Sequence, residues 1–165
     1  MLADQYPWLL EPGLLTVIIR TILAILCAGV IGYERDVHGS SAGFRTHILV
    51  CLGAMLAMTT GQFAAMHYTV DATRIGAQVV SGIGFLGAGS IIVKRENHIS
   101  GLTTAAGLWA SACIGLAIGI GFYEGAIVGA IAVYCIEHFL LKYSKRLKQR
   151  SQEEKEKEQE KEQEK

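Results

Sequence analysis

The sequence predicts an all-α integral membrane protein with five transmembrane helices, and three observations support this fold class. Half of the 165 residues are apolar, and they are gathered into long runs. Each run has 18 or more residues, close to the roughly 20 helical residues that a bilayer core about 30 Å thick requires. The charges are unevenly placed, because the only Lys and Arg between Leu14 and Leu141 are Arg20, Arg35, Arg45, Arg74, Lys94 and Arg95. A soluble helical domain with five such runs would have almost no polar surface, so this class is excluded.

The predicted spans follow from the limits of the apolar runs. The connection between the last two spans, around Gly121, is so short that it predicts a tight helical hairpin. Residues 1–13 then form an extracytoplasmic segment, residues 14–141 the transmembrane domain and residues 142–165 a charged cytoplasmic tail. The five spans are Leu14–Tyr33, Phe44–Phe63, Ile75–Val93, Leu102–Ile120 and Tyr123–Leu141.

Lys and Arg in the connections predict the orientation. Basic residues concentrate in cytoplasmic loops. The segment before the first span has none, whereas Arg35 and Arg45 border the first connection and Lys94 and Arg95 lie in the third. The tail opens with five more basic residues within 142–150. We therefore expect the N-terminus outside and the C-terminus in the cytoplasm.

Two segments resemble each other and suggest that two hairpins arose by duplication, with a fifth helix added. GVIG at 29–32 is followed by a polar loop and AGFRT at 42–46, and GFLG at 84–87 is followed by a basic loop and SGLTT at 100–104. Both hairpins face the same way, which predicts a pseudo-twofold axis along the membrane normal. Superposition would place Arg45 beside Thr103 and Thr46 beside Thr104 at one cytoplasmic entrance, with helix caps supplied by Ser40, Ser41 and Ser100.

Several polar residues near the span ends are functional candidates. Glu34 and Arg35 end the first span, and either they pair and serve a function or they are ordinary loop charges. Asp71 is well placed to cap the third span. Arg74, Gln78 and Ser81 follow at i, i+4 and i+7, so they line one helical face. Such a stripe in a membrane indicates either a functional site or hydrogen bonds between helices.

The remaining polar groups have plainer interpretations. Arg20, well inside the first span, is expected to reach towards the outer interface or to pair with Glu124 or Asp71. Glu137 and His138 are expected to lie near the cytoplasmic membrane interface and to anchor the end of the fifth span there. The GxGxxG at 82–87 lies inside an apolar run without the strand and the acidic residue of a dinucleotide site, so we interpret it as helix packing. The four cysteines lie in separate runs and predict small buried thiols: Cys27, Cys51, Cys113 and Cys135.

No catalytic, cofactor or metal site is expected from the sequence. No nucleophile–base pair is visible, and neither histidines nor carboxylates show metal-ligand spacing. We therefore expect a protein that is not an enzyme, with no cofactor and no nucleic-acid partner.

Five motifs together resemble the MgtC/SapB family over nearly all of the hydrophobic region. They are GYER at 32–35, AGFRTHILVCLGA at 42–54, DATRIGAQ at 71–78, VSGIGFLGAG at 80–89 and GLTTAAGLWASACIGLAIGIG at 101–121. The resemblance implies a bacterial inner-membrane protein linked to growth under magnesium limitation, acid or phosphate stress, and in some pathogens to survival inside macrophages. It also implies modulation of other membrane machines, including the proton-translocating ATP synthase.

The resemblance also identifies candidate residues and one difference. Many members carry a cytoplasmic C-terminal ligand-binding domain, whereas only 24 residues follow Leu141 here. We therefore expect the transmembrane domain alone. The residues that match the family's motifs are Glu34, Arg35, Arg45, Thr46, Asp71, Arg74, Gln78, Thr103 and Thr104.

Two functions stay open on the sequence. The first is a regulatory membrane protein of magnesium homeostasis or stress adaptation that contacts a partner membrane protein within the lipid bilayer. The second is a small transporter or channel for Mg²⁺ or another ion. Mg²⁺ prefers oxygen ligands and sheds water reluctantly, and no Asp or Glu lies near the middle of any predicted span. The first function is therefore favoured, and the close-packing faces are also compatible with a homo-oligomer.

Overall fold

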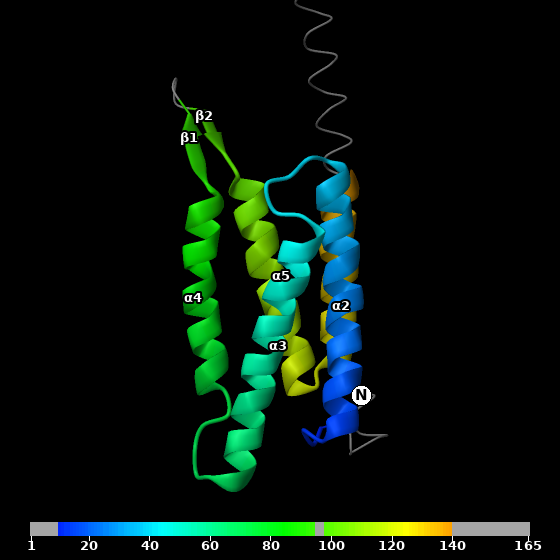
Figure 1. Cartoon of the computed structure of the whole chain (residues 1–165), viewed down its shortest axis with the longest axis vertical. Helices are drawn as coiled ribbons and strands as arrows, with labels where there is room; N and C mark the ends of the chain where they lie inside the picture. The colour runs from blue at the N-terminus through cyan, green and yellow to red at the C-terminus, as the bar shows by residue number, and fades with distance from the viewer. Residues whose placement is uncertain (1–9, 95–97, 140–165) are drawn as a thin grey trace, which may run out of the picture.

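The protein is an antiparallel helical bundle in the computed structural model, which describes residues 10–94 and 98–139 (Figure 1). Four helices are α2 (Leu14–Val37), α3 (Phe44–His67), α4 (Arg74–Ser90) and α5 (Leu102–Ile120). A final helix follows over residues 123–139. Between α4 and α5 lie two short strands, β1 (Ile92–Lys94) and β2 (His98–Ser100).

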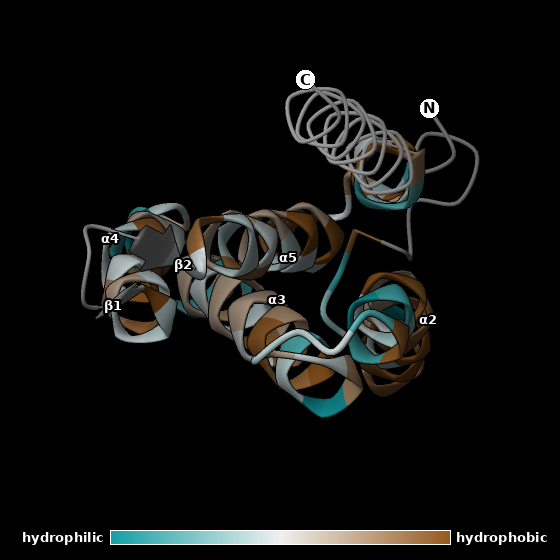
Figure 2. Ribbon diagram, turned by 90° about the horizontal axis from the view of Figure 1, so that it is seen from above, coloured by the Kyte–Doolittle hydropathy of each residue, from teal (hydrophilic) through white to brown (hydrophobic). Residues whose placement is uncertain are grey.

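The bundle is built around α3 and α5. These two helices pack closely in the middle, α4 lies at one edge, and α2 and the final helix lie on the other side (Figures 1 and 2). The end of the bundle that carries β1 and β2 is called the hairpin end below. The opposite end, where α3 connects to α4, is called the far end.

Among the described residues, three helices are long and apolar enough to cross a membrane, namely α2, α3 and α5. Their outward faces carry large apolar side chains such as Leu26 and Leu49, each at least 60% exposed. Exposed apolar surface of this extent suits contact with lipid and not with water. The chain is therefore a multi-pass membrane protein.

The core is filled by small and medium side chains, and glycines allow its helices to approach one another closely. Ala24, Ala28 and Ile31 of α2 are fully buried beside Cys51 and Met55 of α3. Close approach of α3 and α5 requires glycine, since a Cβ at Gly119 would come within 2.6 Å of the Met55 carbonyl oxygen. Small residues in membrane helices mark close contacts of this kind.

Each predicted span coincides with a helix over most of its described residues, but several limits were wrong. The first span continues past Tyr33 to Val37 and the second past Phe63 to His67. The third begins at Arg74 and ends at Ser90. The fourth matches as predicted. The end of the fifth prediction and the whole 142–165 tail lie outside the described residues.

The connection after α4 is an antiparallel hairpin and not the simple loop that the all-α prediction implied. Ile92 pairs with Ser100 and Lys94 with His98. The β-branched sequence at 91–93 favours extended structure over a further helical turn. The hairpin leads into α5 through Gly101, whose φ of +95° favours glycine.

The predicted helix caps are also wrong. The N-cap residues are Gly43, Thr73 and Gly101, and none has a side-chain cap hydrogen bond. At the start of α3 the carboxylate of Asp36 accepts the backbone N–H of Phe44 at 3.0 Å. At α3, a side chain from the preceding helix therefore takes the capping role that the sequence assigned to Ser40 and Ser41.

Candidate functional site: a buried polar cluster at the hairpin end

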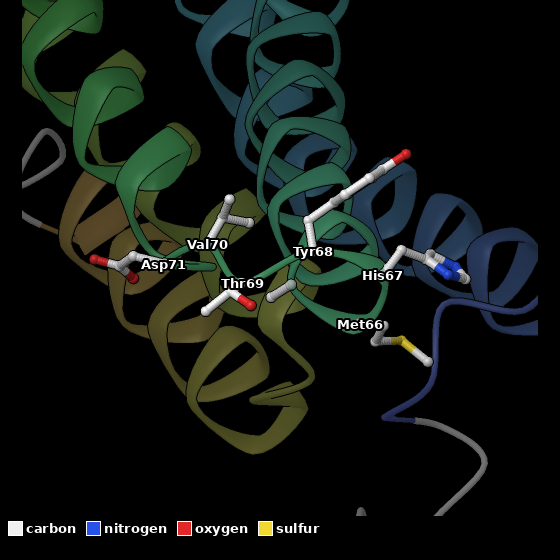
Figure 3. Close-up of a pocket in the computed structure, with 7 residues that line it drawn as sticks. Met66, His67, Tyr68, Thr69, Val70 and Asp71 are labelled. Carbon is white, nitrogen blue, oxygen red and sulfur yellow. The ribbon is translucent and has the colours of Figure 1, made fainter.

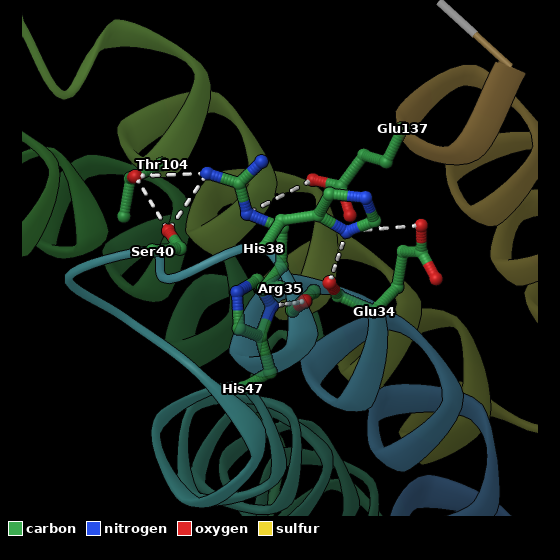
Figure 4. A network of polar contacts seen from close by, with 8 residues as sticks. Glu34, Arg35, His38, Ser40, His47, Thr104 and Glu137 are labelled. Carbon is green, nitrogen blue, oxygen red and sulfur yellow. Dashed lines mark hydrogen bonds and ion pairs between the residues drawn. The ribbon is translucent and has the colours of Figure 1, made fainter. Parts of the chain in front are cut away.

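Arg35 is the centre of a buried cluster at the hairpin end (Figure 4). It lies in the last turns of α2 and is 6% exposed. Its Nη2 donates to Ser40 Oγ at 2.8 Å and to Thr104 Oγ1 at 3.0 Å. Its Nε lies 3.8 Å from Oε1 of Glu137, on the final helix. One guanidinium therefore joins α2 to α5 and to the final helix.

Glu34 forms the second part of the cluster with two histidines. Its Oε1 lies 2.9 Å from Nδ1 of His138 and 3.2 Å from Nδ1 of His38. Nδ1 of His38 also lies 2.9 Å from the Glu34 carbonyl oxygen. A carbonyl oxygen only accepts, so this nitrogen of His38 carries the proton. The Glu34 carboxylate is thus held between His38, one turn further along the chain, and His138 of the final helix.

His47 and Ser111 form the third part. Nδ1 of His47 in α3 lies 2.8 Å from Oγ of Ser111 in α5, and both side chains are fully buried. This is a nucleophile–base pair of the kind that the sequence did not reveal. Both side chains are closed off from the surface of the bundle, and their contact joins α3 to α5.

The first and third parts meet over Gly107. A Cβ at this position would lie 2.9 Å from Oε1 of Glu137 and 3.2 Å from Cε1 of His47. A larger residue here would require both side chains to shift. Three buried atoms here have no hydrogen-bond partner among the described residues: Nε of Arg35, Nε2 of His47 and Oε2 of Glu137. The cluster thus contains buried hydrogen-bonding atoms that its own residues do not satisfy.

Electrostatics explain why such charges persist inside the bundle. A buried charge is tolerated only when it is paired and hydrogen-bonded. Arg35 is compensated by Glu137 and by two hydroxyl groups, while Glu34 is compensated by imidazoles that can carry positive charge. The cluster thus gathers two carboxylates, one guanidinium and three imidazoles at the hairpin end.

A second buried arginine lies near the far end. Arg20 is fully buried, so the expectation that it reaches outward to the interface is wrong. Its Nη1 donates to the Gly119 carbonyl oxygen at 2.7 Å and to Gln62 Oε1 at 2.8 Å, and its Nε donates to Tyr123 Oη at 3.1 Å. The guanidinium thus joins α2, α3, α5 and the final helix.

The structure brings only part of the predicted set together. Glu34, Arg35 and Thr104 meet in the cluster. Arg45 and Thr46 are exposed and line a groove between α3 and α4. Thr103 is exposed beside the buried Thr104. The hydrogen bonds of Thr104 go to Arg35 and Ser40, so the duplication did not predict its partners.

The other three predicted residues lie near the far end. Asp71 is not the cap of α4, because Thr73 occupies the N-cap position. Hydrogen bonds from the side chain and then the backbone N–H of Thr73 lower the pKa of the exposed Asp71 carboxyl. Arg74 and Gln78 are exposed on α4. Asp71 also lines an open surface pocket of about 640 Å³ formed by residues 65–71, with His67 on its other side (Figure 3).

Sequence reasoning missed several members of the cluster. Glu137 was interpreted as an interfacial anchor, yet it is 5% exposed and pairs with Arg35. A signal was available, because Tyr123, Ala126, Ala130 and Glu137 recur at helical spacing on one face of the final helix, and the first three are buried too. His47 and Ser111 carry no comparable local signal.

Comparison with known proteins places the chain in a family. The MgtC family model matches residues 21–146, which include the whole cluster. YhiD of Escherichia coli K12, whose name refers to magnesium transport, is 43% identical over 136 residues, covering 79% of this chain and 63% of YhiD. SapB of Bacillus subtilis is 34% identical, covering 81% of this chain and 59% of SapB. MgtC of Salmonella typhimurium is 38% identical, covering 79% and 54%.

The chain thus spans less than two thirds of the length of these relatives. No solved structure matches it. The family match covers more than half of the chain and agrees with the resemblance seen in the motifs. This chain belongs to the MgtC family.

Proposed function

We propose that this protein is a five-span bacterial membrane protein that serves magnesium homeostasis by binding and modulating a partner membrane protein. In this proposal it carries out no enzymatic chemistry. Membership of the MgtC family and the magnesium-related name of YhiD support the physiological setting. A family name alone does not define a mechanism, so the argument rests on two features of the bundle.

The outward face of α4 carries the proposal. Ala77, Ser81, Gly84 and Ala88 recur at helical spacing and are all exposed, and no atom lies within 4 Å of a Cβ built at Gly84. Arg74 and Gln78 flank this row. Polar side chains inside a bilayer almost always face protein, and small residues mark surfaces where helices approach closely. The face therefore suits a transmembrane helix of another protein.

The second feature is a bundle interior that disfavours cations. Arg20 and Arg35 are both buried on α2, about 22 Å apart at 1.5 Å per residue. Mg²⁺ sheds its water only in exchange for oxygen ligands, so a path through the bundle would need polar groups between these two arginines. Between them lies a packed core of small apolar side chains. This supports modulation over conduction.

The proposal includes the topology. Helix α4 has 17 residues and the final helix 17 described ones, at the lower limit of about 17 for a span. Arg35 and Arg45 lie at the hairpin end, which the rule for positive loops assigns to the cytoplasm. The N-terminus is then outside and the C-terminus inside. A second copy of this chain is one candidate for the α4 face, as a homo-oligomer would require.

A transporter of Mg²⁺ or another ion is the second candidate. The name of YhiD refers to such an activity. One observation favours it here, namely that Glu34 and Glu137 are buried at the hairpin end and provide oxygen atoms close to the membrane interface. In the described residues no group of three or more His, Cys, Asp and Glu side chains could hold a metal ion. We therefore rank it second.

Growth rescue tests the α4 face. In a bacterium deleted for its family member and grown in low Mg²⁺, this chain should restore growth. Gly84→Leu should lose rescue, because a leucine there blocks helix approach, although the protein should reach the membrane in normal amount. Val128→Leu, at an exposed apolar site of the final helix, is the matched control and should rescue. Full rescue by Gly84→Leu would overturn the proposed role of this face.

A further inference from the structure

A groove of about 710 Å³ runs along the bundle between α3 and α4. Its floor is the buried cluster of Ala54, Ile83 and Ala112, with Val50 and Val79 packed against it. Leu49 and Leu86 form its walls and are 68% and 56% exposed. At Gly53 no atom lies within 4 Å of a built Cβ, so the groove is open to the surrounding medium. Its body is therefore entirely apolar.

The mouth of the groove, at the hairpin end, is polar. Arg45 and Thr46 line it. A smaller hollow of about 390 Å³ shares Thr46 and Leu86 with the groove and adds Ser41 and Ser90, so the two form one continuous surface. The guanidinium of Arg45 is exposed and has no hydrogen bond or ion pair with another described residue. The nearby Asp36 carboxylate is already engaged by the Phe44 amide.

The length of the groove along α3 indicates what kind of molecule fits it. From Arg45 to Ala54 the lining of α3 extends about 13 Å at 1.5 Å per residue. One leaflet of a bilayer core about 30 Å thick is about 15 Å. The length of the groove therefore matches the length that a single acyl chain spans in one leaflet. The row of small residues on α4 lies on the side of that helix opposite the groove. A partner helix bound to this row would therefore leave the groove free.

We propose that this groove binds a phospholipid, with its phosphate on Arg45 and one acyl chain between α3 and α4. Charge complementarity fixes the headgroup end, since guanidinium and phosphate form paired, charge-assisted hydrogen bonds. Thr46, Ser41 and Ser90 surround the same end with hydroxyl groups. Leu49, Leu86 and the open strip over Gly53 accommodate the chain. The site thus holds a lipid in the leaflet at the hairpin end.

Native mass spectrometry of the purified full chain in detergent tests the site with palmitoyl-oleoyl phosphatidylglycerol as probe. The wild-type protein should retain a first lipid most tightly. Arg45→Gln should weaken that first adduct roughly tenfold, as loss of a charge-assisted contact implies, while Arg45→Lys should restore part of it. Arg74→Gln, which removes an exposed arginine near the far end, is the matched control and should bind normally. Equal binding by wild type and Arg45→Gln would overturn the proposal.

Two further variants test the acyl chain. Gly53→Leu fills the open strip and should also lose the first adduct. Ala132→Leu, at an exposed position of the final helix, adds the same bulk elsewhere and should not. Circular dichroism of each variant separates lipid loss from misfolding. Normal lipid binding by a folded Gly53→Leu variant would contradict the assignment of the chain to this groove.

Two further experiments distinguish a phospholipid from other occupants of the groove. Soluble glycerol 3-phosphate in large excess should not displace the lipid, and displacement would mean a site for free phosphate. A photo-crosslinker at Leu49 in intact membranes should give a lipid adduct. A discrete crosslink to a protein would instead assign the groove to a partner helix and overturn the proposal.

Discussion

At the scale of single residues, charge burial is the dominant feature of this protein. Arg35 and Glu137 are both nearly inaccessible and lie 3.8 Å apart. Removing one member of such a pair leaves the other charge buried without compensation, which costs about 3–5 kcal/mol, whereas removing both costs much less. The pair therefore specifies which helices meet more than it adds stability.

A double-mutant cycle measures this pair. Arg35→Met alone should lower the free energy of unfolding in mixed micelles by about 3 kcal/mol, because Glu137 is left buried. Adding Glu137→Leu should recover a large part of the loss. Tyr33→Met, at an exposed position of the same helix, controls for the change in bulk. Losses that simply add in the double variant would contradict a direct interaction.

Gly107 provides a steric test of the same cluster. Alanine in place of glycine in a helix normally stabilises by up to about 1 kcal/mol. Here the added Cβ would crowd Glu137 and His47, so Gly107→Ala should destabilise by about 1–3 kcal/mol. Gly129→Ala, where the added Cβ would meet Ile114 at an ordinary 3.7 Å, is the matched control. A stabilised Gly107→Ala variant would be inconsistent with the described geometry.

At the scale of helices and strands, the sequence predicted the limits of a helix correctly where neighbouring residues determine them. The limits of α5 were correct because glycines with positive φ, Gly101 and Gly121, flank it. The end of α2 was wrong because Glu34 and Arg35 resemble loop charges, and only contacts with Glu137, Thr104 and His138 make them helical and buried. The His47–Ser111 pair likewise depends on how α3 meets α5, which no local pattern encodes.

The connection before α4 gives a prediction about pH. Hydrogen bonds from Thr73 lower the pKa of the Asp71 carboxyl below its ordinary 3.8, so the folded connection favours the ionised form. Its contribution is present above the ordinary value and is lost as pH falls through the lowered one. The side-chain carboxyl resonance of Asp71 should titrate with a midpoint below 3.8. Thr73→Val should move the midpoint upward, and an unchanged midpoint would contradict the role of Thr73.

At the scale of the whole molecule, the two buried arginines define a closed bundle. Arg20 holds four helices together near the far end, and Arg35 joins three near the hairpin end. The surfaces that we propose to be functional lie on the outside of this bundle, on the small polar face of α4 and in the groove beside α3. The sequence predicted the helices and several cluster members, but which faces turn inward follows only from their three-dimensional packing.

Magnesium flux into liposomes tests this account most directly. The purified full chain, reconstituted into vesicles that enclose a Mg²⁺-sensitive dye, should admit Mg²⁺ no faster than protein-free vesicles, because the packed apolar core between the two arginines offers the ion no oxygen ligands. A known Mg²⁺ channel in parallel vesicles shows that the assay responds. Protein-dependent entry of Mg²⁺ that Glu34→Gln abolishes would contradict the closed bundle and establish the transporter instead.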